Sequence, residues 1–490
     1  MSQWPRFLLA ALVLGLVLAF VATRPAARGH LEAFVSYYCG GAAVGAHVDP
    51  YATAFVAHCE EVNEPGLMPA GVAEPAVLPP AGLAFFALFA LLPYQVAGGL
   101  FLALSLGALL GAAVSVARVT GLRSAVPFGA FAFLCGFVNL YYGEIVPIVL
   151  FGLCFAGWAL SRKRYALAAA GLAIALAEPH VAIPAALAAF AYERRTRLPL
   201  AVVAGVLLCA SFVLGPHSLW HFVHDVLPVH AWAEISSGDQ YSSTWIAHWL
   251  GAGNRMALDI GSAFSLLGWV AGVVVAQRVA ARLSEPAALV YVPVAFAVVL
   301  PLFVHDLQLP LAIPAGLLLA RRGRHAGLAW AGVVLSAFPW VPAHLWKPTY
   351  PLLVLAAVAL AFGAIASLRY RLVFAASLIA GYTALEKLLA RAKGIVASSG
   401  AADPVPTGAD PSLASVAWGR YVWAAVPSRE ITVGTLCGKL LSFAGPFAVA
   451  GAALLEASGP LPYCGADGSP IVADSVPIAA ADGVPIAAAD

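Results

Sequence analysis

Long apolar runs separated by short polar segments make up most of this chain. A helix that crosses a hydrocarbon core about 30 Å thick needs about 20 apolar residues, and runs of roughly this length recur from residue 7 to residue 455. The pattern predicts an all-α, polytopic membrane helix bundle with about 12 to 14 transmembrane helices. No small-residue cleavage site follows the run at 7–23, so we interpret it as a retained anchor rather than a signal peptide.

Composition supports a membrane protein. The chain is 62% hydrophobic and only 10% charged, with a mean hydropathy of +0.89. So few polar residues cannot cover a soluble globule of this length, so membrane lipids are expected partners. The net charge of +2 is small, and no basic cluster has aromatic residues interleaved with it, so nucleic acid is not an expected partner.

Clusters of basic residues between the runs indicate the orientation of the chain. Cytoplasmic loops of membrane proteins are enriched in Lys and Arg, and such clusters occur at residues 118–123, 162–164, 194–197, 278–282, 321–324 and 369–371. The runs therefore pair into hairpins whose tips face outward, at residues 139–144, 178–180, 216–259, 305–306 and 342–348. We expect a multi-pass protein of a bacterial-type inner membrane, with its ionisable residues gathered on the extracytoplasmic side.

The alternating direction of the apolar runs also divides the chain into regions. Residues 1–371 are expected to form one transmembrane module with outer loops at 24–95 and 216–258. Residues 79–93, bounded by prolines, are too short to cross and should form a juxtamembrane helix in the first outer loop. Residues 372–456 are a less regular transmembrane region with an outer loop at 394–430, and the repetitive tail at 457–490 is expected to be disordered.

The first outer loop carries candidate chemistry. Cys39 and Cys59 lie twenty residues apart, and in an oxidising compartment a disulfide between them would contribute about 3 kcal/mol. Glu32 is the acidic residue before Tyr37, and it is either an interfacial charge or a general base that takes a proton from an acceptor hydroxyl. Asp49 begins an Asp-Pro-Tyr sequence, for which we favour a structural role in a turn.

Three outward tips carry further ionisable residues. Glu144 lies at a span boundary, where a carboxylate is either part of a site or a solvated charge at a helix start. His180, in Glu178-Pro179-His180, either donates a hydrogen bond to a phosphate or is a plain interfacial histidine. His305 stands at another hairpin mouth and can donate to a phosphate oxygen, with Asp306 holding its tautomer.

The large outer loop contains three histidines with helical spacing, His217, His221 and His224. Spacing of this kind can hold zinc, but an amphipathic interfacial helix rich in Trp and His explains it better. We therefore predict no metal site; a divalent cation stays open but has no support in the sequence. Arg255, at the end of this loop, can pair with an anionic lipid headgroup.

The order of these motifs resembles a known enzyme family. In chain order the motifs are Tyr37-Tyr38 with Gly45 and Asp49-Pro50-Tyr51, then Leu78-Pro79-Pro80, Gly143-Glu144, Glu178-Pro179-His180, and His305-Asp306 with Pro310. This order is similar to that of the C-type superfold glycosyltransferases that use polyprenyl-phosphate sugars, specifically glycosyltransferase family 87 and its domain-of-unknown-function 2029 relatives. Ala33 stands where the family usually has its catalytic Asp, and Glu32 is the adjacent residue.

The resemblance implies an extracytoplasmic, inverting transferase without a cofactor. A sugar, with mannose as the main expectation, would pass from a polyprenyl-phosphate donor to a glycan or glycolipid acceptor. Glu32 would be the base, and the donor and its phosphate would be bound by His305, His180, Arg255 and Glu144. The residues expected to shape the loop are Tyr37, Tyr38, Asp49 and Tyr51. Two alternatives stay open: a lipid or solute transporter or flippase, which should carry charges near mid-membrane, and an inactive scaffold.

Overall fold

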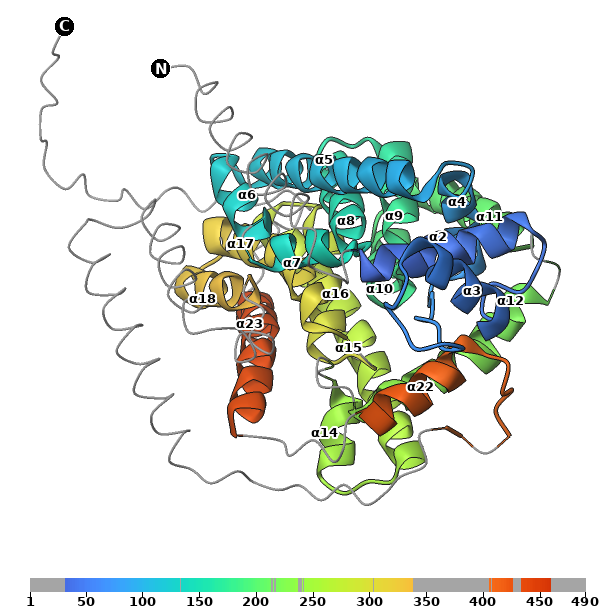
Figure 1. The fold of residues 1–490 in the computed structure, drawn as a ribbon. Helices are drawn as coiled ribbons and strands as arrows, with labels where there is room; N and C mark the ends of the chain where they lie inside the picture. Colours follow the sequence, from blue (N-terminus) through green and yellow to red (C-terminus); the bar gives the residue numbers. More distant parts are fainter. Residues whose placement is uncertain are drawn as a thin grey trace, which may run out of the picture.

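A computed structural model describes residues 31–132, 134–212, 215, 217–236, 240, 242–302, 304–337, 405–406, 408–425 and 433–459. The described residues form helices, two isolated β-bridges and no strand, which confirms the predicted all-α membrane bundle (Figure 1). The expected anchor at 7–23, the tip at 342–348 and all but the first residues of the expected tail lie outside these ranges.

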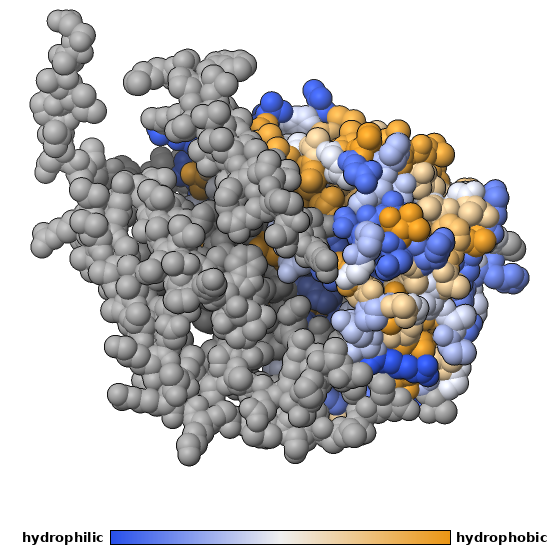
Figure 2. Space-filling view, in the orientation of Figure 1, coloured by the Kyte–Doolittle hydropathy of each residue, from blue (hydrophilic) through white to orange (hydrophobic). Residues whose placement is uncertain are grey.

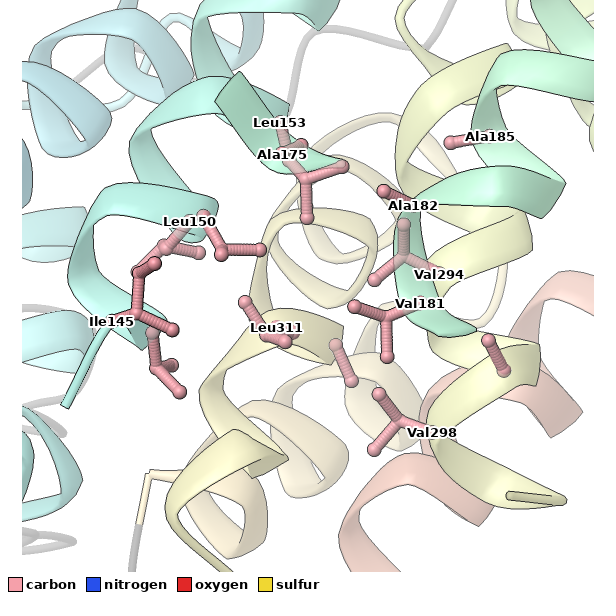
Figure 3. Close-up of a cluster of buried hydrophobic side chains, with 14 of the residues drawn as sticks. Ile145, Leu150, Leu153, Ala175, Val181, Ala182, Ala185, Val294, Val298 and Leu311 are labelled. Atoms are coloured by element: carbon pink, nitrogen blue, oxygen red, sulfur yellow. The ribbon is translucent and has the colours of Figure 1, made fainter. Parts of the chain in front are cut away.

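Helix α16 (Ala288–Val299) forms the centre of the bundle. All of its residues are buried, as expected for a helix that is apolar on every face. It packs against α8 (Val146–Ser161), α10 (Pro179–Tyr192), α15 (Asn254–Leu283) and α23 (Val433–Ser458). Figure 3 shows side chains such as Leu150, Val181 and Val294 converging in this core. Gly157 of α8 allows a close approach, since a Cβ there would lie 2.4 Å from the Tyr291 ring.

Further helices surround this core. They are α5 (Tyr94–Thr120), α6 (Ala125–Ala132), α7 (Leu134–Tyr142), α9 (Tyr165–Ala175), η1 (Arg194–Thr196), α11 (Arg197–Ser211), η5 (Asp306–Ala312), α17 (Ile313–Arg322) and α18 (Ala326–Ser336). Among the described helices, α5 and α15 are long and apolar enough to cross a membrane, and several others are apolar but shorter. Large apolar side chains of α5, such as Leu100 and Leu104, are exposed, and Figure 2 shows large apolar areas on the described surface, as on a lipid-facing surface. The count of 12 to 14 spans stays a prediction.

Buried ion pairs tie together the end of the bundle that carries the basic clusters. Arg322 of α17 lies 2.9 Å from Glu285, and Arg282 of α15 lies 3.4 Å from Glu456 of α23. Glu456 also accepts a hydrogen bond of 2.8 Å from the Arg324 backbone. Because Glu285 and Glu456 are almost fully buried, removing one partner of a pair would leave an uncompensated charge. The pairs therefore fix how α15, α17 and α23 meet at this end.

The first outer loop differs from expectation because much of it is helical. It contains α2 (Glu32–Gly45) and α3 (Thr53–Asn63), joined by a Cys39–Cys59 disulfide, and then α4 (Pro80–Phe89) at the position expected for the juxtamembrane helix. Ten residues of α2 are buried, which explains why an apolar segment here folds rather than remaining an open loop. A Cβ on Gly41 would lie 2.4 Å from the Phe86 backbone, so a glycine lets α2 lie directly on α4.

Two other expected loops also contain helices. The segment 216–258 contains α12 (Ser218–His221), η3 (Phe222–Val226), α13 (Leu227–Ala233), η4 (Glu234–Ser236) and α14 (Ser243–Trp249). In the expected loop 394–430, residues Ala414–Ala425 form α22. Leu413, Ala414 and Val416 are each no more than 2% exposed, so this part of the expected outer loop packs into the protein.

Candidate active site

A cavity of about 980 Å³ lies where α2, α22 and the start of α15 meet the loops that precede α8, α10 and η5. It is lined by six of the residues singled out from the sequence: Glu32, Tyr37, Glu144, His180, Arg255 and His305. These residues come from positions far apart in the chain. One cavity therefore collects polar side chains from the first outer loop and from four separate tips.

Glu32 is positioned by the start of α2. It is the first residue of that helix, and the preceding Leu31 donates a backbone hydrogen bond of 3.1 Å to the Tyr141 carbonyl. This bond joins the start of α2 to the tip that carries Glu144. Ala33 and Ser36 also line the cavity, so both Glu32 and the adjacent position face the same space.

Glu144 is held by Tyr37 across the cavity wall. The Tyr37 hydroxyl donates a hydrogen bond of 3.0 Å to Glu144 Oε2. Burial raises the pKa of Glu144, although His305 and the Tyr37 hydrogen bond partly offset this effect. Gly143 has a φ of 70°, and a Cβ there would lie 2.7 Å from that of Phe34. The tight turn that places the Glu144 carboxyl group in the cavity therefore requires glycine at position 143.

Glu178 and His305 are linked through Gln308. The Gln308 side chain donates to Glu178 Oε2 at 3.2 Å and accepts from the His305 backbone N–H at 3.1 Å. His180 Nδ1 lies 3.3 Å from the same Glu178 oxygen. Burial, together with the nearby Glu144, raises the pKa of Glu178 to about 8. Near neutral pH, Glu178 is therefore protonated in most molecules.

The His305 ring faces a second carboxyl group, Glu234. His305 Nε2 lies 3.9 Å from Glu234 Oε2, and His230 Nε2 lies 3.8 Å from Glu234 Oε1. Burial, with a further contribution from His305, lowers the pKa of His230 to about 3, so His230 stays neutral. In the described part of the chain, Glu234 thus joins Glu144 as a carboxyl group near His305; the Asp306 side chain lies outside the described residues.

A further acidic residue that lines the cavity, Glu74, lies in the loop before α4. The Trp418 indole of α22 donates a hydrogen bond to it. Burial raises the pKa of Glu74 well above its usual value, and the charges of Glu32, Glu60 and Glu234 raise it further. The raised pKa favours the protonated form of Glu74, and a protonated carboxyl group can itself donate a hydrogen bond.

Arg255 lies in the first turn of α15, rather than in the loop where the sequence placed it. The N-terminus of a helix carries a partial positive charge, so this guanidinium and the helix end favour an anion in the same region. Asp259, one turn further along the same face, also lines the cavity. Past this turn, α15 continues as an apolar helix with exposed side chains such as Leu266 and Val270.

The remaining loop residues lie outside the cavity. Tyr38 donates to the Leu92 carbonyl at 2.9 Å, and Tyr51 donates to the Leu78 carbonyl at 2.8 Å. Asp49 Oδ1 accepts a hydrogen bond of 3.0 Å from the Tyr51 backbone, which closes a turn. These contacts hold α2 and α3 against the segment around α4.

The histidines of the large loop do not form a metal site. His221 lies 2.8 Å from Asp225 and 3.4 Å from Asp49, whereas the His224 ring lies against Trp220. In the part of the chain that the structure describes, no three His, Cys, Asp or Glu side chains converge to hold a metal ion.

Sequence reasoning missed several residues that line the cavity, namely Glu74, Trp232, Glu234, Asp259, Trp418 and Tyr421, and it gave His230 no role. Most are single polar or aromatic residues in loops, without a motif. The spacing of His230 and Glu234, one helical turn apart, was the clearest available signal.

Glu60 is buried and accepts a hydrogen bond from the Glu74 backbone. It provides a test of how burial affects the acidic residues of this region. Burial raises its pKa from 4.5 to about 8, and Glu32 contributes to the increase. Between these values the unfolded chain releases the proton while the folded chain retains it, so the free energy of unfolding should fall as pH rises from 4.5 to 8. Glu60→Gln should remove this loss and stabilise the protein by on the order of 2 kcal/mol at pH 8.

Thermal melting in detergent at pH 5 and pH 8 measures this effect. The matched control is Glu61→Gln, because Glu61 is the next residue of α3 and is exposed. If Glu60→Gln left the pH dependence of Tm as steep as in the unmodified chain, the buried Glu60 carboxyl would not be its source.

Comparison with known proteins bears on the identity of this site. Residues 77–304 match the family model of glycosyltransferase family 87, and no curated protein or solved structure matches the chain. The matched segment includes Glu144, Glu178, His180 and Arg255, while Glu32 and His305 flank it. The match agrees with the family that the order of the motifs indicated: a little under half of the chain is similar to glycosyltransferase family 87, which supports a membrane glycosyltransferase.

Proposed function

We propose that this protein transfers a sugar, with mannose as the first candidate, from a polyprenyl-phosphate donor to a hydroxyl of a glycan or glycolipid. The observation that carries the proposal is the shared cavity, in which Glu32 lies with His305 and Arg255. The reaction needs a base for the acceptor and hydrogen-bond donors for the leaving phosphate. Both kinds of group line the same space.

In this mechanism, Glu32 takes the proton of the acceptor hydroxyl as its oxygen attacks the anomeric carbon. The bond between that carbon and the phosphate oxygen breaks, and the phosphate leaves with the electron pair, which inverts the anomeric centre. His305 and Arg255 stabilise the phosphate as its charge increases. The buried, protonated Glu178 avoids adding a further negative charge beside the donor.

The donor lipid would reach the cavity along the exposed apolar surface of α15. Its first turn lines the cavity, and the rest of the helix presents exposed apolar side chains along a length sufficient to cross a membrane. A polyprenyl chain lying along this surface would place its phosphate beside Arg255. We propose the extracytoplasmic side for this end of the bundle, because the basic clusters lie at the opposite end.

The cavity favours an enzyme over a transporter. A transport path needs polar or broken helices near mid-membrane, whereas the central α16 is apolar and fully buried. The far end of the bundle is tied by the Arg322–Glu285 and Arg282–Glu456 pairs. We propose residues 1–371 as the main catalytic module, with α22 from the later region completing its cavity.

Sugar transfer in membranes containing the full chain tests the proposal. Polyprenyl-phosphate mannose and polyprenyl-phosphate glucose, each radiolabelled in the sugar, serve as donors, and GDP-mannose serves as the nucleotide-sugar control. Membranes containing the chain should transfer label from a lipid donor to an added glycoside, and membranes lacking it should not. Absence of transfer from every lipid donor would leave the transporter or scaffold alternatives.

A further inference from the structure

The wall of the cavity formed by α22 has the character of a carbohydrate subsite. We propose that this wall binds the acceptor, that the acceptor is an uncharged sugar there, and that Tyr421 and Glu74 contact it. The proposal rests on the proposed function, because it assigns the second substrate of the same cavity. It concerns a segment outside the residues that match the family model.

Tyr421 supplies an accessible aromatic surface. It lines the cavity and is 37% exposed, whereas Trp418, one turn earlier on α22, is only 8% exposed. The Trp418 ring stacks on His230 at 5.6 Å and its indole N–H binds Glu74. Trp418 is therefore a positioning residue, and the Tyr421 ring is available to a ligand.

Glu74 complements this ring chemically. A sugar ring presents C–H bonds on its faces and hydroxyls around its edge, so an aromatic side chain beside a polar group suits it. Burial favours the protonated form of Glu74, and a protonated carboxyl group can both donate to a hydroxyl oxygen and accept from a hydroxyl group. Glu32, the proposed base, lines the same cavity as Glu74, so the proposed sugar site and the base share one space.

The α22 wall is fixed to the first outer loop by backbone pairing. Ala414 donates to the Tyr51 carbonyl at 2.8 Å, and Thr53 donates to the Ser412 carbonyl at 2.7 Å. Leu413, between them, is 1% exposed. The Asp49-Pro50-Tyr51 turn thus has a second consequence, because it holds the segment that carries Trp418 and Tyr421.

Charge indicates that the acceptor is uncharged. Among the described lining residues, six carry carboxyl groups, and Arg255 supplies the guanidinium. The donor phosphate would occupy Arg255 and His305. The ionisable groups that act on Glu74 are all acidic, namely Glu32, Glu60 and Glu234, so a phosphate on the acceptor would meet no cation there with which it could pair.

Equilibrium binding to the purified full chain tests the subsite without requiring transfer. The probes are radiolabelled octyl mannoside and its 6-phosphate. Octyl mannoside should bind at least about tenfold more tightly than the phosphate, and Tyr421→Ala should weaken its binding by about tenfold. Glu74→Ala should weaken it as well, whereas Glu74→Gln, which keeps a donor and an acceptor, should change it little. Tyr192→Ala is the matched control, because Tyr192 is also 37% exposed but lies at the end of α10, outside the cavity.

The outcomes separate the subsite from the reaction. Equal binding of the two probes, or unchanged binding in Tyr421→Ala, would overturn the subsite. Binding that depends on Tyr421, without consumption of any lipid donor, would support the subsite and reject the proposed transferase reaction. Donor hydrolysis by water in Tyr421→Ala, at the rate of the unmodified chain, would show that the variant is folded.

Discussion

Replacing Glu32 by Gln is expected to lower the rate of sugar transfer by roughly 10²–10⁴-fold, the usual contribution of a general base. Gln keeps the size of the side chain but cannot accept the proton of the acceptor hydroxyl. The affinity for octyl mannoside should change little, because the amide can still form hydrogen bonds. The measurement is kcat at saturating donor and acceptor, with Glu61→Gln as the control for an exposed carboxylate nearby.

The adjacent position sharpens this test. Ala33 also lines the cavity, and it stands where the related enzymes usually have their catalytic Asp. A Glu32→Ala chain should be nearly inactive, and adding Ala33→Asp should restore part of its activity if both carboxylates reach the same point. Full activity of Glu32→Gln would instead assign the base elsewhere.

Glu74 is the nearest competitor for the role of base. Burial raises its pKa and favours its protonated form, which is a poor proton acceptor, and its hydrogen bond to Trp418 holds it at the proposed acceptor wall. Glu74→Ala should therefore raise the acceptor KM more than it lowers kcat. The reverse pattern in the two variants would exchange the roles of Glu32 and Glu74.

The gathering of the outer tips could be predicted from the sequence because it follows from a local pattern. Basic clusters between apolar runs fix the direction of each run, so Glu144, Glu178 and His305 had to lie at the same end of the bundle. The motifs also carry recognisable Gly or Pro residues, which favour turns and helix ends. The structure places these tips around one cavity.

The acceptor wall could not be predicted because it depends on long-range contacts. The bond between Thr53 and Ser412 joins residues 359 positions apart, and no local pattern indicates such a pairing. Trp418 and Glu74 are single residues in segments that read as loops. The sequence also suggested that α2 was an open loop, since its apolar face becomes apparent only where it packs against α4 and α5.

The second large effect is expected at His305. His305→Ala should reduce transfer by about 10²-fold, because the leaving phosphate would lose a hydrogen-bond donor as its negative charge develops. The loss should appear in kcat, and the acceptor KM should be unaffected. This distinguishes His305 from Tyr421, whose removal should affect acceptor binding instead.

The neighbours of His305 are specific to this position, so a histidine elsewhere should not take over its role. Gln308 binds its backbone at 3.1 Å, and Glu234 lies 3.9 Å from its ring. His305→Gln, which retains a donor, should recover part of the loss. His325→Ala, at an exposed histidine between α17 and α18, is the matched control. If the His305 and His325 variants lost activity equally, stabilisation of the leaving phosphate would not be the function of His305.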